Sequence, residues 1–271
     1  LSNNTFFNFG NSLNSYAVRI RAVANASYFN ITNCGVGFLI DTSIVNSSVW
    51  NSTITNCTKD FSINTGADNF ELYNVTFNKS RADFQSDGSG FMEVFYQYRT
   101  NVTNQNLAAV NLADVSIKNV SGTQISDAQL TDANGLTNYE WVMEYIQKGD
   151  ANYTSGCTGS TFYINCSTPH NVTASKTGYS TNSTNITIDQ SKTAWIMIES
   201  PFILAYVPTT INFSIVENNN QTFSITYTNA SAVTIRWFVN DTEQTGSTNS
   251  SQYIWVGNFS QQGFYRIKVN L

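Results

Sequence analysis

Three consecutive stretches of the sequence align with one another without a gap, and this repeat decides the fold of the first hundred residues. They are residues 29–51 (FNITNCGVGFLIDTSIVNSSVWN), residues 52–74 (STITNCTKDFSINTGADNFELYN) and residues 75–97 (VTFNKSRADFQSDGSGFMEVFYQ). The period is 23 residues, and the chain before residue 29 aligns at an offset of 22. A fixed period of this size, without a helical pattern inside it, is typical of stacked coils of short strands.

In register, the repeats form columns of similar side chains. The apolar columns are Phe9, Ile31, Ile54 and Phe77; Tyr16, Phe38, Phe61 and Phe84; Val18, Ile40 and Ile63, with Ser86 as the break; and Val49, Leu72 and Phe95. There are two polar columns at adjacent positions. The first contains Asn11, Asn33, Asn56 and Lys79, and the second contains Ser12, Cys34, Cys57 and Ser80. Because coils stack at about 4.8 Å, like residues pack on like. The columns predict a right-handed parallel β-helix of about four coils over residues 1–97.

The polar columns carry two further predictions. Cys34 and Cys57 lie on successive coils, within the Cα separation that a disulfide needs, although a buried pair of free thiols is the alternative. An asparagine ladder that points inward cannot carry a glycan, so Asn56 is expected to be bare.

After residue 97 the pattern changes to short alternating strands separated by turn signals. The expected strands are residues 110–118, 140–147, 170–176, 185–188 and 193–199, and then residues 210–217, 221–228, 233–240, 252–256 and 263–269. Such spacing is typical of β-sandwiches. The predicted fold class is therefore all-β: a short right-handed parallel β-helix (1–97) followed by two β-sandwich domains (98–199 and 200–271).

Two resemblances support this division. The segments VSIKNVSG (115–122), TDANGLTN (131–138), HNVTASKTGY (170–179) and ITI (186–188) resemble transthyretin-like, or carboxypeptidase-regulatory-like, domains. Trp237, and Gly263-Phe264-Tyr265 at the start of a late strand, resemble immunoglobulin-like or PKD-type modules. Those resemblances imply a tryptophan in the core between two sheets and a tyrosine at a corner. There is no cysteine pair across the sheets, so an antibody-type domain is excluded.

The acceptor pattern Asn-x-Ser/Thr occurs 21 times, whereas 36 Asn and 62 Ser or Thr among 271 residues would give about 8 by chance. The acceptors expected to carry glycans are Asn3, Asn25, Asn30, Asn46, Asn51, Asn74, Asn78, Asn101, Asn119, Asn152, Asn165, Asn171, Asn182, Asn185, Asn212, Asn220, Asn229, Asn240, Asn249 and Asn258. The excess predicts an N-glycosylated, extracellular cell-surface protein. Glycans would also keep a surface soluble that has only 11% charged residues.

The remaining composition excludes several classes of function. The net charge of −5, with no basic cluster, argues against nucleic-acid binding. The longest apolar run, residues 194–207, is interrupted by Glu199 and Pro201 and is too short to span a membrane.

Cys157 and Cys166 are expected to form a disulfide across a hairpin. Zinc is not expected, since there is no CxxC motif and His170 is the only histidine.

Parallel β-helices often belong to polysaccharide lyases and hydrolases, so catalysis must be considered. The candidate carboxylates are Asp41, Asp60, Asp68, Glu71, Asp83 and Asp87. Asp41, Asn64 and Asp87 fall in one column, and Asp60 stacks on Asp83 without an Arg or His neighbour in that column. We expect no catalysis and no cofactor. Calcium is the weaker alternative at residues 83–88 and 132–135, neither of which completes an EF-hand-type ligand set.

The order of modules, together with the dense sequons, resembles modular archaeal cell-surface proteins of the S-layer or surface-filament type. The resemblance implies a non-catalytic, self-assembling structural subunit whose partners are copies of itself or adjacent modules. An adhesin that binds carbohydrate is the first alternative, and a polysaccharide-cleaving enzyme the second. A β-helix without a cap leaves strand edges open. We therefore expect a neighbouring subunit, or an upstream part of the chain, to cover the first coil at Phe7, Phe9 and Tyr16.

Overall fold

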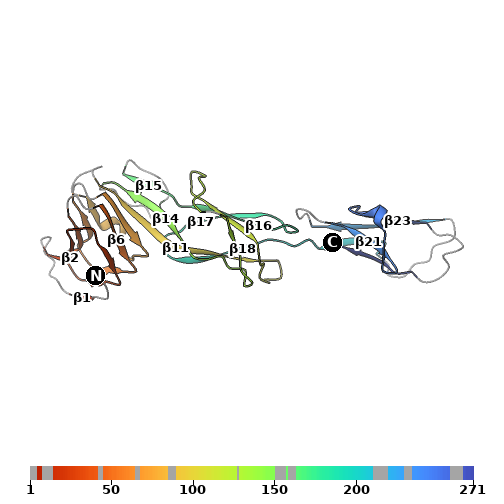
Figure 1. Cartoon of the computed structure of the whole chain (residues 1–271), viewed down its shortest axis with the longest axis horizontal. Helices are drawn as coiled ribbons and strands as arrows, with labels where there is room; N and C mark the ends of the chain where they lie inside the picture. Colours follow the sequence, from red (N-terminus) through yellow and green to blue (C-terminus); the bar gives the residue numbers. More distant parts are fainter. Residues whose placement is uncertain are drawn as a thin grey trace.

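The computed structural model describes residues 5–7, 15–41, 45–64, 68–84, 90–126, 128–149, 157, 163–209, 219–228, 234–256 and 265–271. Within these ranges the chain is all-β, as predicted, and its helical content is two single 3₁₀ turns, η1 (Lys79–Arg81) and η2 (Thr245–Ser247). The strands follow one another along a single long axis (Figure 1). The first ten strands lie at one end, and β19 to β24 lie at the other.

Strands of the first hundred residues pair in parallel, repeat upon repeat, in three sheets. One sheet contains β1 (Thr5–Phe7), β4 (Asn30–Thr32) and β7 (Thr53–Thr55). The second contains β2 (Tyr16–Ile20), β5 (Val36–Ile40), β8 (Lys59–Ile63) and β10 (Ala82–Phe84). The third begins with β3 (Asn25–Ser27), β6 (Val45–Trp50), β9 (Asp68–Tyr73) and β11 (Met92–Thr103). Successive strands of each sheet therefore come from successive repeats.

The central register agrees with the predicted columns. The paired residues are Ile31 with Ile54, Phe38 with Phe61, Ile40 with Ile63 and Val49 with Leu72. All eight side chains are buried, and the rings of Phe38 and Phe61 stack with centroids 5.6 Å apart. Like-on-like stacking thus builds the interior of these sheets.

At the first coil the predicted register is wrong. Phe6, not Phe9, pairs with Ile31, and Val18, not Tyr16, pairs with Phe38. Residue 9 itself lies outside the described residues. The shift from Tyr16 to Val18 is of two residues and keeps the same face of the strand buried, so the apolar pattern alone does not reveal it. The shift from Phe9 to Phe6 is of three residues and reflects a different length of chain between the strands.

The last coil is shifted as well. Ala82 pairs with Phe61, and Phe84 pairs with Ile63, because η1 shortens this coil to 21 residues. Phe84 thus fills the place where the predicted column had Ser86. In the third sheet Leu72 pairs with Val94, so that Phe95 pairs with Tyr73 instead.

Asparagine turns the corners between the coils. The backbone is left-handed, with φ between 46° and 56°, at Asn33, Asn46, Asn51, Asn56, Asn69 and Asn74. Asparagine tolerates this conformation better than most residues, because its short side chain bonds locally. Part of the unusual asparagine content therefore belongs to the backbone geometry of the coils.

Strand β11 continues past the parallel strands and changes partner. Residues 92–95 pair with β9, while residues 98–103 pair in parallel with β18 (Lys192–Met197). On its other side β11 pairs with β14 (Glu140–Gln147), which pairs with β15 (Ile164–Cys166). The predicted boundary at residue 97 lies inside β11. One cluster of buried side chains extends across it, from Val18 to Ile198.

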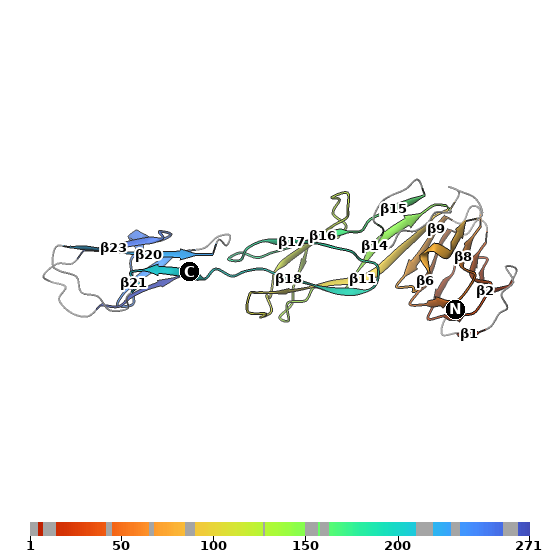
Figure 2. The same ribbon diagram turned by 180° about the vertical axis from the view of Figure 1, so that it is seen from behind.

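A further sheet packs on this core, with β13 (Gln129–Leu130), β12 (Asp114–Lys118), β16 (His170–Ser175) and β17 (Asn182–Ile186) in that order. Beyond residue 200, β19 (Ile203–Val207), β20 (Asn220–Tyr227) and β23 (Gln252–Val256) form one sheet, and β22 (Thr242–Glu243), β21 (Arg236–Val239) and β24 (Ile267–Asn270) form another. Figure 2 shows β20, β21 and β23 of these sheets at the end remote from the coils.

The C-terminal sheets enclose a separate small core of Phe223, Ile225, Ile235 and Trp237. Trp237 lies on the central strand β21, is 3% exposed and donates its Nε1–H to the carbonyl of Ser250 at 2.8 Å. Its burial agrees with the expectation from the immunoglobulin-like resemblance.

Most of the strands expected after residue 97 are present. The bounds of β14 and β23 match the predictions, and β12, β16, β17, β18, β20, β21 and β24 overlap their predicted ranges. The strand expected at residues 210–217 lies outside the described residues.

Candidate functional site

The sequons are the most numerous candidate sites, and those described lie at the surface. Five of the 21 acceptors, Asn3, Asn152, Asn212, Asn229 and Asn258, lie outside the described residues. The other sixteen are exposed or half-exposed: Asn25, Asn30, Asn46, Asn51, Asn56, Asn74, Asn78, Asn101, Asn119, Asn165, Asn171, Asn182, Asn185, Asn220, Asn240 and Asn249. Each could therefore present its side chain to a glycan.

The prediction that Asn56 points inward is wrong. Asn33 and Asn56 both have exposed side chains, since the left-handed backbone at this corner directs them outward. Asparagine ladders occur at two other corners. Asn74 donates its Nδ2 to Oδ1 of Asn51 at 2.9 Å, and Asn69 donates to Asn46 at 2.7 Å. No inward position therefore forbids a glycan at Asn56.

The amide nitrogen Nδ2 is the atom that an N-glycan occupies, and its surroundings differ among the sequons. At Asn78 and Asn119 the side-chain oxygen accepts the hydroxyl of the sequon serine at 2.7 Å and that serine's backbone N–H at 3.1 Å. Both turns are thus fixed through Oδ1. By contrast Nδ2 itself donates at Asn74, at Asn171 to Oδ1 of Asn185, and at Asn182 to the carbonyl of Met197.

The carboxylates suggested by the sequence lie mostly in ion pairs. Asp41 accepts Arg19 at 2.8 Å, lies 3.4 Å from Arg21 and accepts Nδ2 of Asn64 at 3.2 Å. The predicted Asp41–Asn64 column is therefore present, while Asp87 and the side chain of Asp68 are not described. A carboxylate that two guanidinium groups approach is well suited to fixing a corner.

The predicted stacking of Asp60 on Asp83 is wrong, since Asp83 pairs with Ser62, and both acids have cationic neighbours outside their predicted column. Asp83 forms an ion pair with Lys59 at 2.6 Å. Asp60 is fully buried, and burial raises its pKa to about 6, against the opposing effects of the Asn78 N–H at 2.6 Å and the charge of Arg81. Each cation comes from the repeat next to that of its acid: Lys59 faces Asp83, and Arg81 faces Asp60. A column of equivalent positions cannot show such pairs, because the two partners stand at different positions in their repeats.

In the turn at residues 132–135, the carboxylate of Asp132 bonds to the backbone of its own turn. Asp132 accepts the backbone N–H groups of Asn134 and Leu136 at 2.8 and 2.9 Å, and these bonds lower its pKa. In the described part of the chain, no group of three or more His, Cys, Asp or Glu side chains is arranged to hold a metal ion.

An aromatic row, which the sequence interpretation missed, crosses the outer face of the largest sheet. Trp50 stacks on Tyr73 with ring centroids 3.8 Å apart, and Tyr73 stacks on Phe95 at 4.9 Å. Trp141 of β14 lies nearly perpendicular to Trp50 and Tyr73, at 5.3 and 5.0 Å. The signal was present as an aromatic residue at the same point of three repeats. The gap-free alignment does not show it, because it places Phe95 in the buried column of Val49 and Leu72, whereas Phe95 pairs with Tyr73.

Two acidic side chains lie beside this row on neighbouring strands. Tyr73 donates its hydroxyl to Glu71 at 3.2 Å, and burial together with Glu71 raises the pKa of Tyr73 to about 12. Glu93 pairs with Glu71 in the register, and burial and the charge of Glu71 raise its pKa. The row is therefore a half-buried aromatic ladder with a negative border.

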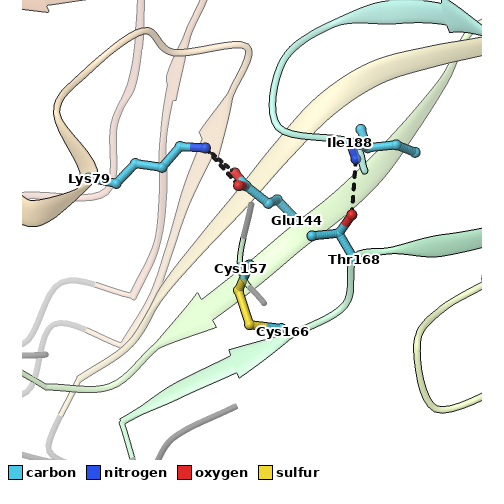
Figure 3. Close-up of a disulfide and its surroundings, with 6 residues drawn as sticks. All are labelled: Lys79, Glu144, Cys157, Cys166, Thr168 and Ile188. Carbon is cyan, nitrogen blue, oxygen red and sulfur yellow. Dashed lines mark hydrogen bonds and ion pairs between the residues drawn. A yellow bond between two sulfur atoms is a disulfide. The ribbon is translucent and has the colours of Figure 1, made fainter. Parts of the chain in front are cut away.

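Both predicted disulfides are present. Cys34 and Cys57 join successive coils, with Cα atoms 4.4 Å apart, and Cys157 is joined to Cys166 with Cα atoms 5.6 Å apart. Figure 3 shows the second bridge beside the ion pair of Lys79 and Glu144. Lys79 Nζ lies 2.7 Å from Oε1 of Glu144, which is fully buried, so that η1 is tied to β14.

The N-terminal ends of the parallel sheets are the candidate assembly site. Within the described residues, β2 and β3 are the terminal strands of their sheets, and so each has one strand edge without a partner strand. Tyr16 on β2 is 39% exposed and lies under the guanidinium of Arg19, 5.6 Å from the ring centroid. The other two predicted contact residues are Phe7 and Phe9. Phe9 and the side chain of Phe7 lie outside the described residues.

The chain matches no protein-family model and no curated protein. Among solved structures it is similar to BcpA, the major pilin subunit of Bacillus cereus. With a variant form of BcpA it shares 12% identity over 65% of this chain and 58% of the pilin chain, with a TM-score of 0.28. With BcpA itself the identity is 13%, over 55% of this chain and 47% of that one, again with a TM-score of 0.28. The chain thus spans less than two thirds of either pilin chain.

Proposed function

We propose that this chain is a non-catalytic, N-glycosylated structural protein of the cell surface, a subunit of a layer or filament built from copies of itself. The observation that carries the proposal is the excess of sequons together with their placement, because all sixteen described acceptors reach the surface. Two disulfides are consistent with an oxidising, extracellular setting. None of the described helices has the length and apolar character to cross a membrane.

The proposed architecture is a short parallel β-helix over residues 1–97, followed by transthyretin-like and immunoglobulin- or PKD-like sandwiches. The three parallel sheets support the first part, and the separate core around Trp237 supports the last. The core of the first sandwich is continuous with that of the parallel sheets, whereas the last sandwich has a core of its own.

Glycopeptide mass spectrometry of the protein secreted by a glycosylating host tests the proposal. We expect most of the 21 sequons to be occupied, with the fullest occupancy at Asn78 and Asn119, whose side-chain amides bond to the turn through Oδ1. Lower occupancy is expected at Asn74 and Asn182, because a sugar there competes with a hydrogen bond of Nδ2. Occupancy of fewer than about a third of the sequons would contradict the proposal, because the number of glycans would then not exceed the number of sequons expected by chance, which is about 8.

A further inference from the structure

Asn101 has an unusual neighbour for a sequon. It lies on β11, where it pairs in register with Trp195 of β18. Paired residues of adjacent strands point to the same face, and their strands are about 5 Å apart. Trp195 is 66% exposed, and Met197, the next residue along that face, is 42% exposed. A large apolar surface therefore lies beside the acceptor.

The backbone holds Asn101 in one position. On the side opposite β18, Val102 donates its N–H to the carbonyl of Gly135 at 2.7 Å, and Thr137 donates to the carbonyl of Thr100 at 3.0 Å. Both neighbours of Asn101 are thus anchored to residues 135–137. Gly135 has a φ of +76°, and a Cβ on this residue would lie 2.4 Å from the carbonyl oxygen of Val102 and 3.3 Å from Oδ1 of Asn101, so the glycine lets both the backbone and the amide approach closely.

The amide group is oriented by this contact. Oδ1 of Asn101 is buried against Gly135 and makes no hydrogen bond within the described residues. Oxygen and nitrogen diverge from the same amide carbon, so burial of Oδ1 on the Gly135 side directs Nδ2 away from it, toward β18 and solvent. The atom that accepts a sugar therefore faces the side on which Trp195 lies.

We propose that Trp195 is the docking platform for the first sugars of an N-glycan on Asn101. The inference rests on the proposed N-glycosylation and adds a defined position for one glycan. The C–H-bearing face of a pyranose is apolar and packs on the electron-rich face of an indole, while its hydroxyls remain in water. Covering Trp195 in this way hides the apolar area beside Asn101 and restrains a glycan that would otherwise be mobile.

Hydroxyl-radical footprinting read by peptide mass spectrometry tests the inference, since it reports Trp195 oxidation and Asn101 occupancy together. In the glycosylated protein we expect Trp195 to oxidise about twofold more slowly than in Asn101→Gln, because a sugar covers one of the two indole faces. Thr103→Ala removes the same sequon but keeps Asn101, and it should expose Trp195 equally. Asn119→Gln is the matched control that removes a distant glycan and should leave Trp195 unchanged.

The outcomes separate this inference from the proposal on which it rests. Unchanged Trp195 oxidation in Asn101→Gln, with Asn101 shown to be occupied in the wild type, would overturn the docking while leaving the glycoprotein intact. An empty Asn101 among occupied sequons would also overturn it. If no sequon is occupied, the proposed function itself fails. Buried Trp237 reports folding, because its oxidation must stay low in every variant for the comparison to count.

Discussion

At the scale of single residues, two buried ionisable side chains make stability depend on pH in opposite directions. Burial lowers the pKa of His170 to about 4, a shift that the carbonyl of Met143 only partly opposes. The folded protein then holds fewer protons than the unfolded chain below pH 6.5, so stability is lost as the pH falls through this range. Asp60, with its pKa raised to about 6, binds its proton more tightly when folded and loses stability as the pH rises from about 4.

His170→Phe should remove the loss of stability that His170 causes as the pH falls. His170 is fully buried on β16, so a ring of similar size keeps the packing while the cost of charging disappears. Between pH 7 and pH 4 the wild type should lose up to about 3 kcal/mol more free energy of unfolding than the variant. Guanidinium titrations at the two pH values measure this difference. Asp60→Asn should change the pH dependence with the opposite sign, and equal pH profiles for wild type and His170→Phe would show the assignment to be wrong.

At the scale of elements, the aromatic row ties four strands together from outside the core. Tyr73 lies between Trp50 and Phe95 and bonds Glu71, so it contributes both ring contacts and a hydrogen bond. We expect Tyr73→Ala to cost about 2–3 kcal/mol of unfolding free energy, and Tyr73→Phe less than about 1 kcal/mol, because the ring supplies most of the contact. Chemical denaturation measures both. Equal losses in the two variants would place the stabilisation in the hydroxyl and contradict a stacked row.

The disulfide between successive coils should contribute to the stability of the fold. Cys34 and Cys57 close a loop of 23 residues, and the loop-entropy relation gives about 3 kcal/mol for such a loop. Replacing both residues by alanine should lower the free energy of unfolding by that order. Reduction of the wild type should have a similar effect on the coils, and a double variant as stable as the wild type would mean that the stacked sheets alone hold the first coils together.

Much of the fold at this scale could be predicted from the sequence. The period of 23 places Ile31 on Ile54 and Phe38 on Phe61, since stacking favours identical residues. The first and last coils could not be aligned correctly, because their lengths change at the corners and a shift of two residues preserves the buried face. Asn56 was misplaced for a related reason. The pattern marks a corner position, but only the left-handed backbone there shows that the side chain points outward.

At the scale of the whole molecule, the two ends of the long axis carry different kinds of sheet. The remote end consists of two three-stranded antiparallel sheets with edge strands of their own, whereas within the described residues β2 and β3 terminate parallel sheets at the other end. A contact between such an end and a different surface of the next copy is heterologous, and contacts of this kind propagate into fibres or layers. The elongated arrangement of strands makes a filament the simplest product of such propagation.

Charge on the terminal strand should therefore block assembly. Tyr16→Lys places a cation on β2 beside Arg19, at the exposed edge where an incoming strand would pair, and charged edges oppose strand addition. We expect it to weaken self-association at least about tenfold, and Phe9→Asp to act in the same direction. Thr226→Lys, on the exposed face of the interior strand β20, is the matched control and should assemble normally. Sedimentation velocity and electron microscopy measure the result. Filaments of Tyr16→Lys as long and as numerous as those of the wild type would show that the first coil is not the contact.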